Sequence, residues 1–318
     1  MFTIENKTKN GFDKIILKDE ITGTLAEIIP SCGAILHAFA IVKNGKEFNV
    51  IDSYDSAEDF KKHVTSKGFL GCKLSPFVCR INKGKYNFGE KKYTIEKYYD
   101  KENALHGELY DQPFTVIDND ANAEQAIVSM KYEYRRSDPG YPFKYDCMVT
   151  YQLQKDNKLN VTTEVINKDE KEIPVQDGWH PYFKLNAKIN DLELAFHSKE
   201  LLEFDEQLIP TGKLIPYNEF DKAKKLGDTF FDNCFTLDFS RHQPLCLLRN
   251  KEQNIQVEII PDKSYPYLQF YTPAHRNSIA IENISGAPDA FNNGMGFKIL
   301  SPGESSTFTT AYKITLLT

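Results

Sequence analysis

The most regular feature of this sequence is the alternation of apolar and polar residues. From residue 145 to residue 153 every second residue is apolar or aromatic, and the alternation resumes from residue 159 to residue 165 after the polar segment KDNK. Successive side chains of a β-strand point to opposite faces of a sheet, so a period of two predicts strands with one buried face. The pattern therefore predicts a β-hairpin over residues 144–167.

Similar signals recur along most of the chain. Apolar and β-branched residues alternate from Phe308 to Leu316, and the segment LLEFDEQLIPTGKLIP (201–216) is expected to turn at Thr211 and Gly212. Helical periodicity is weak and confined to residues 55–63. Because no repeat or linker-like stretch divides the chain, we expect residues 1–318 to form one mainly β domain, a large antiparallel β-sandwich.

Composition narrows the range of partners. The chain has 39 basic and 45 acidic residues, a net charge of −6, and no basic block. Nucleic acids and anionic membranes are therefore not expected as partners. A broad, aromatic-rich β surface suits sugars instead, because sugar rings present C–H patches to aromatic faces and hydroxyls to polar side chains.

The cysteines and the N-terminus indicate the compartment. The six cysteines show no CxxC pair and no His/Cys spacing typical of a metal site. The opening segment MFTIENKTKNGFDK lacks the apolar core of a signal peptide, and no stretch has the length and hydrophobicity of a membrane span. We therefore expect reduced thiols in a cytoplasmic protein.

The segment DGWHPYFKL (177–185) contains the strongest candidate for chemistry, His180. A residue before proline has an extended backbone, and Trp179 and Tyr182 can form walls on either side of the imidazole. Such a frame fixes the ring's orientation and limits its solvation, as a proton donor requires. From this segment alone, a core histidine in a tight β-turn is the favoured interpretation.

Four other residues have a functional and a simpler interpretation each. His106 precedes Gly107, which permits close approach of a ligand to the backbone, although surface-loop histidines are common. Glu282 lies where a buried strand meets a loop; partial desolvation there would favour a base, and exposure to water is the alternative. Asp232 between aromatic residues could bind hydroxyls or form an Asx turn, and Arg80 could bind hydroxyls or pair with a surface acid.

Taken together, these segments resemble the aldose 1-epimerases, or galactose mutarotases. The resemblance runs from about residue 25 to the C-terminus, and its motifs occur in the family's order: LSPFVCRINKGKYNFGEKKY, NALHG, GWHPYFKL, QLIPTGKL, FDNCF, LQFYT and IENISGAPDAFNNG. Each motif alone is short and unspecific, whereas the ordered set is specific. The resemblance implies the large β-sandwich of that family, which the alternation also predicts.

The resemblance also implies roles for individual residues. His180 would be the general acid that protonates the ring oxygen of a sugar, Glu282 the general base at the C1 hydroxyl, and His106 a second active-site histidine. Arg80, Asp232 and Gln269 would bind sugar hydroxyls. No metal or cofactor is implied, because one acid and one base, expected at opposite ends of one small pocket, suffice for opening and reclosing a hemiacetal ring.

Three positions depart from the family pattern. Cys79 and Gly178 each stand where the family commonly has asparagine, and the family's HGG is His106-Gly107-Glu108 here. These differences surround the expected sugar position and leave the proton carriers unchanged. They bear on which sugar is bound more than on the reaction.

Three functions therefore remain open at the level of sequence. The first is a mutarotase for a free aldohexose such as galactose or glucose, acting as a monomer or a homodimer. The second is a sugar-binding β-sandwich without turnover. The third is a hexose-6-phosphate 1-epimerase, for which Arg135 and Arg136, or nearby lysines, would have to bind the phosphate.

Overall fold

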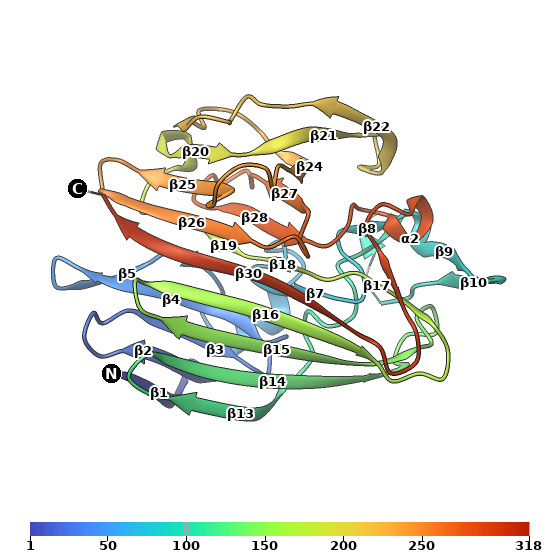
Figure 1. Cartoon of the computed structure of the whole chain (residues 1–318), viewed down its shortest axis with the longest axis horizontal. Coiled ribbons are helices and arrows are strands. Elements are labelled where there is room, and N and C mark those ends of the chain that lie inside the picture. Colours follow the sequence, from blue (N-terminus) through green and yellow to red (C-terminus); the bar gives the residue numbers. More distant parts are fainter. Residues whose placement is uncertain (98, 101, 318) are drawn as a thin grey trace.

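The computed structural model describes residues 1–97, 99–100 and 102–317, and it is built almost entirely of β-strands. Among the described residues, two sheets of nine strands each make up most of the fold. Neighbouring strands in both sheets run antiparallel. The predicted antiparallel β-sandwich is confirmed, and Figure 1 shows its long strands lying side by side along the molecule.

The first large sheet is the main framework of the fold. In spatial order it contains β13 (Thr115–Ala121), β14 (Gln125–Arg135), β15 (Lys144–Gln154), β16 (Lys158–Asn167), β30 (Ser305–Leu316), β26 (Ile255–Pro261), β25 (Cys246–Asn250), β20 (Glu193–Phe196) and β23 (Lys224–Lys225). β15 and β16 are the hairpin predicted from residues 144–167, and the alternating positions Tyr145, Val149, Tyr151 and Leu153 are fully buried.

The second large sheet positions the site described below. Its strands are β22 (Pro210–Pro216), β21 (Ser198–Phe204), β24 (Asp232–Leu237), β27 (Tyr267–Tyr271), β28 (Ile279–Ile284), β18 (Gly178–His180) and β7 (Cys72–Leu74), with β19 (Tyr182–Phe183) and β6 (Ile51–Asp52) joined through β28. All six residues of β28 are buried, so this strand lies in the interior of the protein.

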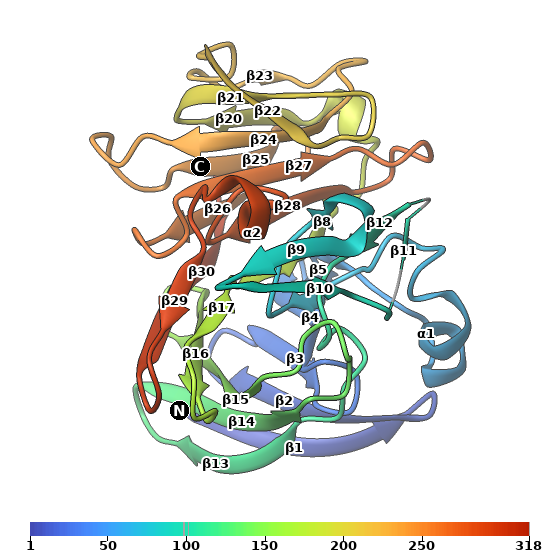
Figure 2. The same cartoon turned by 90° about the vertical axis from the view of Figure 1, so that its right-hand side faces the viewer.

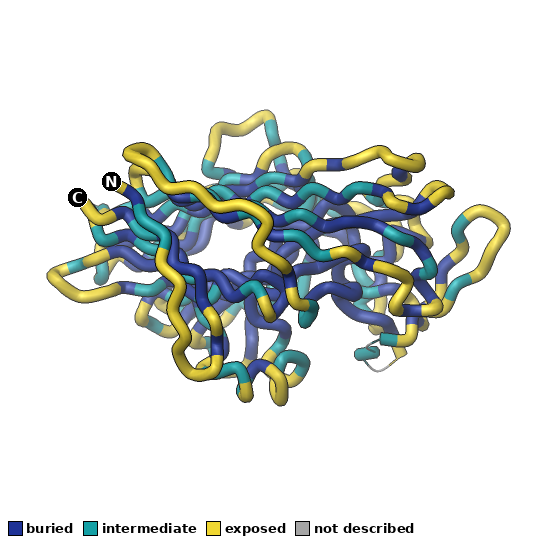
Figure 3. The backbone as a smooth tube through the Cα atoms, turned by 90° about the horizontal axis from the view of Figure 1, so that it is seen from below, coloured by how far each residue is buried: buried dark blue, intermediate teal, exposed yellow. Residues whose placement is uncertain are grey.

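A five-stranded sheet packs against the first large sheet. It is a meander of β1 (Phe2–Lys9), β2 (Phe12–Asp19), β3 (Leu25–Ile29), β4 (Ile35–Lys43) and β5 (Lys46–Asn49). β2 contacts β14 and β15, and the apolar side chains between them belong to one large hydrophobic core (Figure 2). Figure 3 shows that exposed residues are concentrated in hairpin tips and edge strands, whereas the long central strands alternate between buried and intermediate residues.

Smaller elements complete the fold. They are α1 (Ala57–His63), α2 (Ala290–Asn293), the 3₁₀ turns η1 (Asn82–Gly84) and η2 (Ile189–Asp191), and the short strands β8 (Arg80–Ile81), β9 (Lys85–Phe88), β10 (Lys91–Thr94), β11 (Tyr99–Asp100), β12 (Asn103–Leu105), β17 (Ile173–Val175) and β29 (Lys298–Leu300). α1 lies in the segment with weak helical periodicity, and its N-terminus is capped by the Ser56 hydroxyl, which accepts from the Asp59 amide.

The turn between β21 and β22 corrects one prediction. The chain turns at residues 205–209, and Gly212 lies within β22. The Asp205 carboxylate accepts hydrogen bonds from the backbone N–H groups of Gln207 and Ile209. An aspartate side chain can accept hydrogen bonds from the backbone amides of a turn. These local hydrogen bonds place the turn at residues 205–209 and not at Thr211 and Gly212.

Two further observations concern the cysteines and membrane crossing. All six cysteines are buried and unpaired, as the absence of a cysteine pattern predicted. Within the described part of the chain, no helix combines the length and apolar character needed to span a bilayer.

Candidate active site

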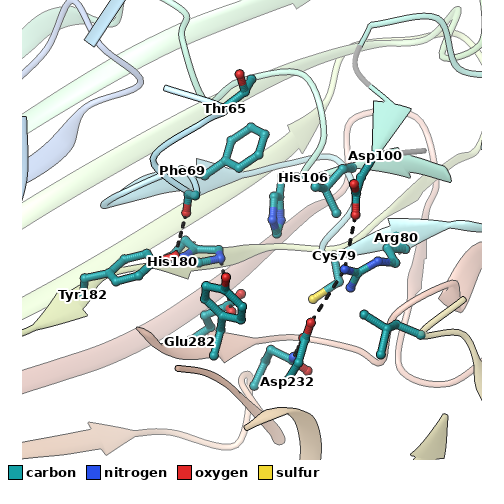
Figure 4. A pocket seen from close by; sticks show the side chains of 15 residues that line it. Thr65, Phe69, Cys79, Arg80, Asp100, His106, His180, Tyr182, Asp232 and Glu282 are labelled. Atoms are coloured by element: carbon teal, nitrogen blue, oxygen red, sulfur yellow. Dashed lines mark hydrogen bonds and ion pairs between the residues drawn. The ribbon is translucent and has the colours of Figure 1, made fainter. Parts of the chain in front are cut away.

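One cavity of about 330 Å³ brings together all the candidate catalytic and sugar-binding residues (Figure 4). Its walls include Arg80, His106, His180, Asp232, Gln269 and Glu282. The volume lies at the lower end of the range of about 300–1,000 Å³ that is typical of small-molecule sites. The tertiary structure therefore brings segments that are distant in the sequence together into one small polar site.

Adjacent strands of the second large sheet supply one wall. Asp232 begins β24, Gln269 lies in β27 directly opposite Glu282 of β28, and His180 ends β18. Gln269 and Tyr271 are two residues apart on the same strand, so both side chains reach the cavity. The pleat and register of the sheet thus fix the relative positions of the carboxylates, the amide and the imidazole.

The small sheet of β8, β11 and β12 supplies the opposite wall. Leu105 pairs with Arg80, and His106 follows directly after β12. The backbones of Cys79 and His106 have positive φ angles of 48° and 63°, and the His106 N–H donates to the Cys79 carbonyl at 2.8 Å. These unusual conformations turn both side chains into the cavity, and such backbone strain is common at functional sites.

An imidazole and a carboxylate are in direct contact at the centre of the site. His180 Nε2 lies 3.2 Å from Glu282 Oε1, and both side chains are almost completely buried. The Tyr182 ring stacks on His180 with a centroid distance of 5.2 Å, and the His106 ring meets His180 edge-on at 4.9 Å. Phe69 packs edge-on against His106 at 4.7 Å. Both imidazoles therefore have fixed orientations.

Burial moves the pKa values of this pair in opposite directions. Removal from water, together with the nearby charge of Arg80, lowers the pKa of His180 to about 3. Removal from water also raises the pKa of Glu282 well above its usual range, and the Asp232 carboxylate adds to the rise. Burial lowers the pKa of His106 well below its usual value as well. The pair consequently retains one proton over a wide pH range, and burial favours its uncharged form.

Arg80 lies between two carboxylates. Its Nη2 is 3.5 Å from Asp100 Oδ2 and 3.8 Å from Asp232 Oδ2. Gln269 Nε2 donates to Asp232 Oδ1 at 3.0 Å. Burial raises the pKa of Asp232, and the Arg80 guanidinium opposes that rise. This cluster combines donors and acceptors that can form hydrogen bonds with a polar ligand.

Several polar atoms at the site lack hydrogen-bond partners among the residues that the structure describes. They are His106 Nδ1, His180 Nδ1, Gln269 Oε1 and Glu282 Oε2. Buried polar atoms are normally paired, so this concentration of unpaired atoms is typical of a site that binds a polar ligand. The same part of the chain shows no group of His, Cys, Asp and Glu side chains arranged to bind a metal ion.

A family model described as "Aldose 1-epimerase" matches residues 13–313. The chain belongs to the aldose 1-epimerase family. An aldose 1-epimerase of Streptococcus thermophilus is 25% identical over 315 residues, covering 87% of each chain. A maltose epimerase of Levilactobacillus brevis is 22% identical over 253 residues, covering 73% of this chain and 72% of that protein.

The structural comparison agrees with this family. A galactose mutarotase-like protein from Clostridium acetobutylicum superposes with a TM-score of 0.87 over 99% of both chains, at 20% identity. The fold of that protein is thus shared over almost all of the described chain. Membership makes the protein an isomerase of the epimerase class with a sugar as its substrate.

Two expectations about the imidazole's surroundings require correction. Trp179 does not line the cavity; its ring contacts Tyr151 on the other side of β18. Consecutive residues of a strand point to opposite faces, so Trp179 and His180 cannot border the same pocket. The acid and base candidates were also expected at opposite ends of the pocket, whereas His180 and Glu282 touch.

Sequence reasoning missed several wall residues of this epimerase-family site. They are Thr65, Gly68, Phe69, Asp100, Leu105, Leu208 and Tyr271. Most lie in loops or short strands without a periodic pattern, so only tertiary packing brings them to the cavity. Tyr271 could have been found, because it follows Gln269 by two residues in a segment that alternates.

Proposed function

We propose that this protein interconverts the α and β anomers of a free aldohexose of the glucose or galactose type. The observation that carries the proposal is the contact of 3.2 Å between His180 Nε2 and Glu282 Oε1 inside a small polar cavity. Aldose 1-epimerase family membership supports the reaction type. The assignments of individual residues below are part of the proposal.

The chemistry requires an acid and a base to be close together. Glu282 removes the proton of the C1 hydroxyl, the C1–O electron pair becomes a carbonyl, the bond from C1 to the ring oxygen breaks, and His180 gives its proton to the ring oxygen. Both oxygens are bonded to C1, so one acid and one base side by side reach both atoms. Rotation about C1–C2 and the reverse transfers close the ring with the opposite configuration.

The buried setting favours ring opening. The reactive form of the pair is an imidazolium and a carboxylate, and opening converts it into a neutral imidazole and a carboxylic acid. Because burial disfavours both charges, as the directions of the His180 and Glu282 pKa shifts indicate, forming this ion pair from the uncharged pair costs free energy, and ring opening releases that free energy again. The pair's proton count is unchanged after a full cycle, so no cofactor is needed.

The remaining residues bind and orient the ring. Arg80, Asp232 and Gln269 form a connected set of donors and acceptors for sugar hydroxyls. His106 lies against His180 and approaches the same sugar oxygen, where its imidazole assists binding and polarisation. Tyr182, which stacks on His180, limits the movement of the acid.

The charges of the cavity favour a free sugar over a sugar phosphate. Among the described wall residues, Asp100, Asp232 and Glu282 are acidic and Arg80 is the one Lys or Arg side chain. Arg135 pairs with Glu133 and Asp146. Neither it nor Arg136, which pairs with Asp169, is a wall residue of the cavity. A phosphate dianion would therefore meet more acidic than basic groups.

Polarimetry on freshly dissolved α-glucose and α-galactose tests the proposal. We expect Glu282→Gln and His180→Asn each to lower kcat by about a hundredfold or more, because each removes one proton carrier. Glu58→Gln, which changes an exposed carboxylate of α1, is the matched control and should retain the wild-type rate. Equal rates for all proteins would contradict the proposal. Sugar binding by wild-type protein with mutarotation at the buffer rate would instead support a binding module.

A further inference from the structure

The two carboxylates beside Arg80 share its positive charge unequally. Arg80 Nη2 donates a long hydrogen bond to Asp100 Oδ2 at 3.5 Å, whereas Asp232 Oδ2 lies 3.8 Å away, beyond hydrogen-bond distance. The Asp232 carboxylate instead accepts from the uncharged amide of Gln269 at 3.0 Å. Among the residues that the structure describes, Asp232 therefore has no cation in hydrogen-bond contact, although its side chain is only 18% exposed.

The neighbouring side chain adds an acceptor that has no donor. Gln269 Nε2 donates to Asp232 and to the Phe270 carbonyl, so both of its N–H groups are used within the protein. Its carbonyl oxygen, Oε1, is buried in the same cavity wall and has no partner among the described residues. Buried acceptors are normally paired, so this part of the wall indicates a ligand group that donates hydrogen bonds.

The positions of the proton carriers determine which part of a sugar faces Asp232 and Gln269. In the proposed reaction the ring oxygen lies at His180 and His106, and the C1 hydroxyl lies at Glu282. Gln269 is directly opposite Glu282 on the neighbouring strand. Figure 4 shows His106 and Asp232 on opposite sides of the cavity. C2 is bonded to C1 and not to the ring oxygen, so its substituent points away from the histidines, toward Gln269 and Asp232.

We propose that Asp232 and Gln269 bind the ammonium group of a 2-amino-2-deoxyhexose, so that protonated amino sugars are the preferred substrates. This inference rests on the proposed function, because it takes C1 to lie at His180 and Glu282. An amine on C2 leaves the C1 hydroxyl and the ring oxygen unchanged. The same two proton transfers therefore open and close the ring.

An ammonium group suits this wall better than a hydroxyl does. It carries three N–H donors and no acceptor, so it can bond the Asp232 carboxylate and Gln269 Oε1 together. A hydrogen bond between an ammonium and a carboxylate is stronger than one between a neutral hydroxyl and a carboxylate. Asp100, on the other side of Arg80, adds a second negative charge to the same cavity. A buried carboxylate without a cation in contact gains most from a charged partner.

Kinetics on four reducing sugars at about pH 6 test the proposal, because α-amino groups have pKa values of about 7.7–8.0 and a 2-amino sugar is cationic at that pH. The sugars are glucose, 2-amino-2-deoxyglucose, its N-acetyl derivative and 6-amino-6-deoxyglucose. After subtraction of the buffer rate, we expect kcat/KM for the 2-amino sugar to exceed the value for glucose about fivefold. It should also exceed the value for the 6-amino sugar, and the uncharged N-acetyl derivative should fall below glucose.

The variant Asp232→Asn tests the contact itself. It keeps the shape of the side chain and can still bond a hydroxyl, but it carries no charge. We expect the ratio of kcat/KM for the 2-amino sugar to that for glucose to fall to about one or less. Asp238→Asn is the matched control, because Asp238 directly follows β24, accepts from the Ser240 hydroxyl and is not a wall residue of the cavity. Its ratio should stay within about twofold of the wild-type value.

The outcomes separate this inference from the proposed function. Turnover of glucose without a gain for the 2-amino sugar would overturn the ammonium site and leave the mutarotase intact. An equal gain for the 6-amino sugar, or an unchanged ratio in Asp232→Asn, would also overturn it. If Asp232→Asn does not fold, the comparison of sugars on the wild-type protein decides. No turnover of any sugar would overturn the proposed function, and the inference with it.

Discussion

The Lys73 ammonium lies 2.5 Å from the Asp177 carboxylate, and neither side chain has any exposed surface. Lys73 also donates to the Gly178 carbonyl at 3.0 Å and lies over the Trp179 ring at 4.5 Å. This buried ion pair therefore holds the strand β18 from the face opposite His180. The Lys73–Asp177 pair supports the strand that carries His180, and neither of its residues lines the cavity.

Removing the lysine should destabilise the protein strongly. Lys73→Met leaves the Asp177 carboxylate buried without its cation, which typically costs about 3–5 kcal/mol of unfolding free energy. Urea unfolding followed by the fluorescence of the chain's single tryptophan, Trp179, measures the effect directly. Lys62→Met removes a partner of an exposed ion pair with Glu58 and should have a far smaller effect. Equal stability of the two variants would contradict the importance of the buried pair.

Stability should depend on pH through the His180–Glu282 pair. The ordinary pKa values are 4.5 for glutamate and 6.5 for histidine, while burial raises the first and lowers the second, to about 3. Between pH 4.5 and 6.5 the unfolded chain and the folded pair each carry one proton, so this pair contributes no slope. Below that range the unfolded chain binds an additional proton, and above it the unfolded chain loses one that the folded pair retains. The pair's contribution to stability therefore falls on both sides.

The variant Glu282→Gln gives a direct check of this pH dependence. With the carboxylate removed, only the lowered pKa of His180 affects the pH dependence. Below pH 6.5 the unfolded chain protonates this histidine and the folded protein does not, so the free energy of unfolding falls. In wild-type protein the corresponding loss begins only near pH 4.5. Urea midpoints measured from pH 3 to pH 9 should show this shift, as an order-of-magnitude change of about two pH units. If the urea midpoints of both proteins fell over the same acidic pH range, His180 and Glu282 would not share a proton.

Replacement of Cys79 by asparagine should strengthen sugar binding. Cys79 lines the cavity with a positive φ of 48°, a conformation that asparagine adopts more readily than most residues. An amide there can bond a sugar hydroxyl, so Cys79→Asn should lower KM for glucose about twofold to tenfold, which corresponds to about 0.5–1.5 kcal/mol. Cys79→Ala is the control without a polar group. A KM that is unchanged or higher in the asparagine variant would count against a hydroxyl contact at this position.

A side chain at Gly107, next to His106, should destabilise the protein. Its φ is 76°, and an added Cβ would approach the Ser75 carbonyl oxygen to 2.3 Å. Gly303 has a similar φ of 78° with no atom within 4 Å of such a Cβ, so it is a matched control for backbone strain alone. Gly107→Ala should cost at least about 1 kcal/mol more unfolding free energy than Gly303→Ala and should reduce kcat. Equal stabilities measured by urea unfolding would contradict the close approach.

The sequence alone determined the local structure where one physical signal dominated. Alternation predicted the hairpin of residues 144–167, because a period of two admits only a half-buried strand. Ordered motifs likewise identified His106, His180 and Glu282 as candidates, and all three line one cavity. Their proposed roles await the kinetic tests above.

Only the tertiary structure decided how those residues meet. His180 and Glu282 are distant in the sequence, and their contact depends on β18 and β28 being neighbours in one sheet. Local patterns carry no information on such pairing, and they could not show that Trp179 faces away from the pocket. Asp100, in the short strand β11, and Leu208, in the turn between β21 and β22, reach the site for the same reason. Burial, which sets the charge state of the central pair, is a property of the assembled fold and of no single segment.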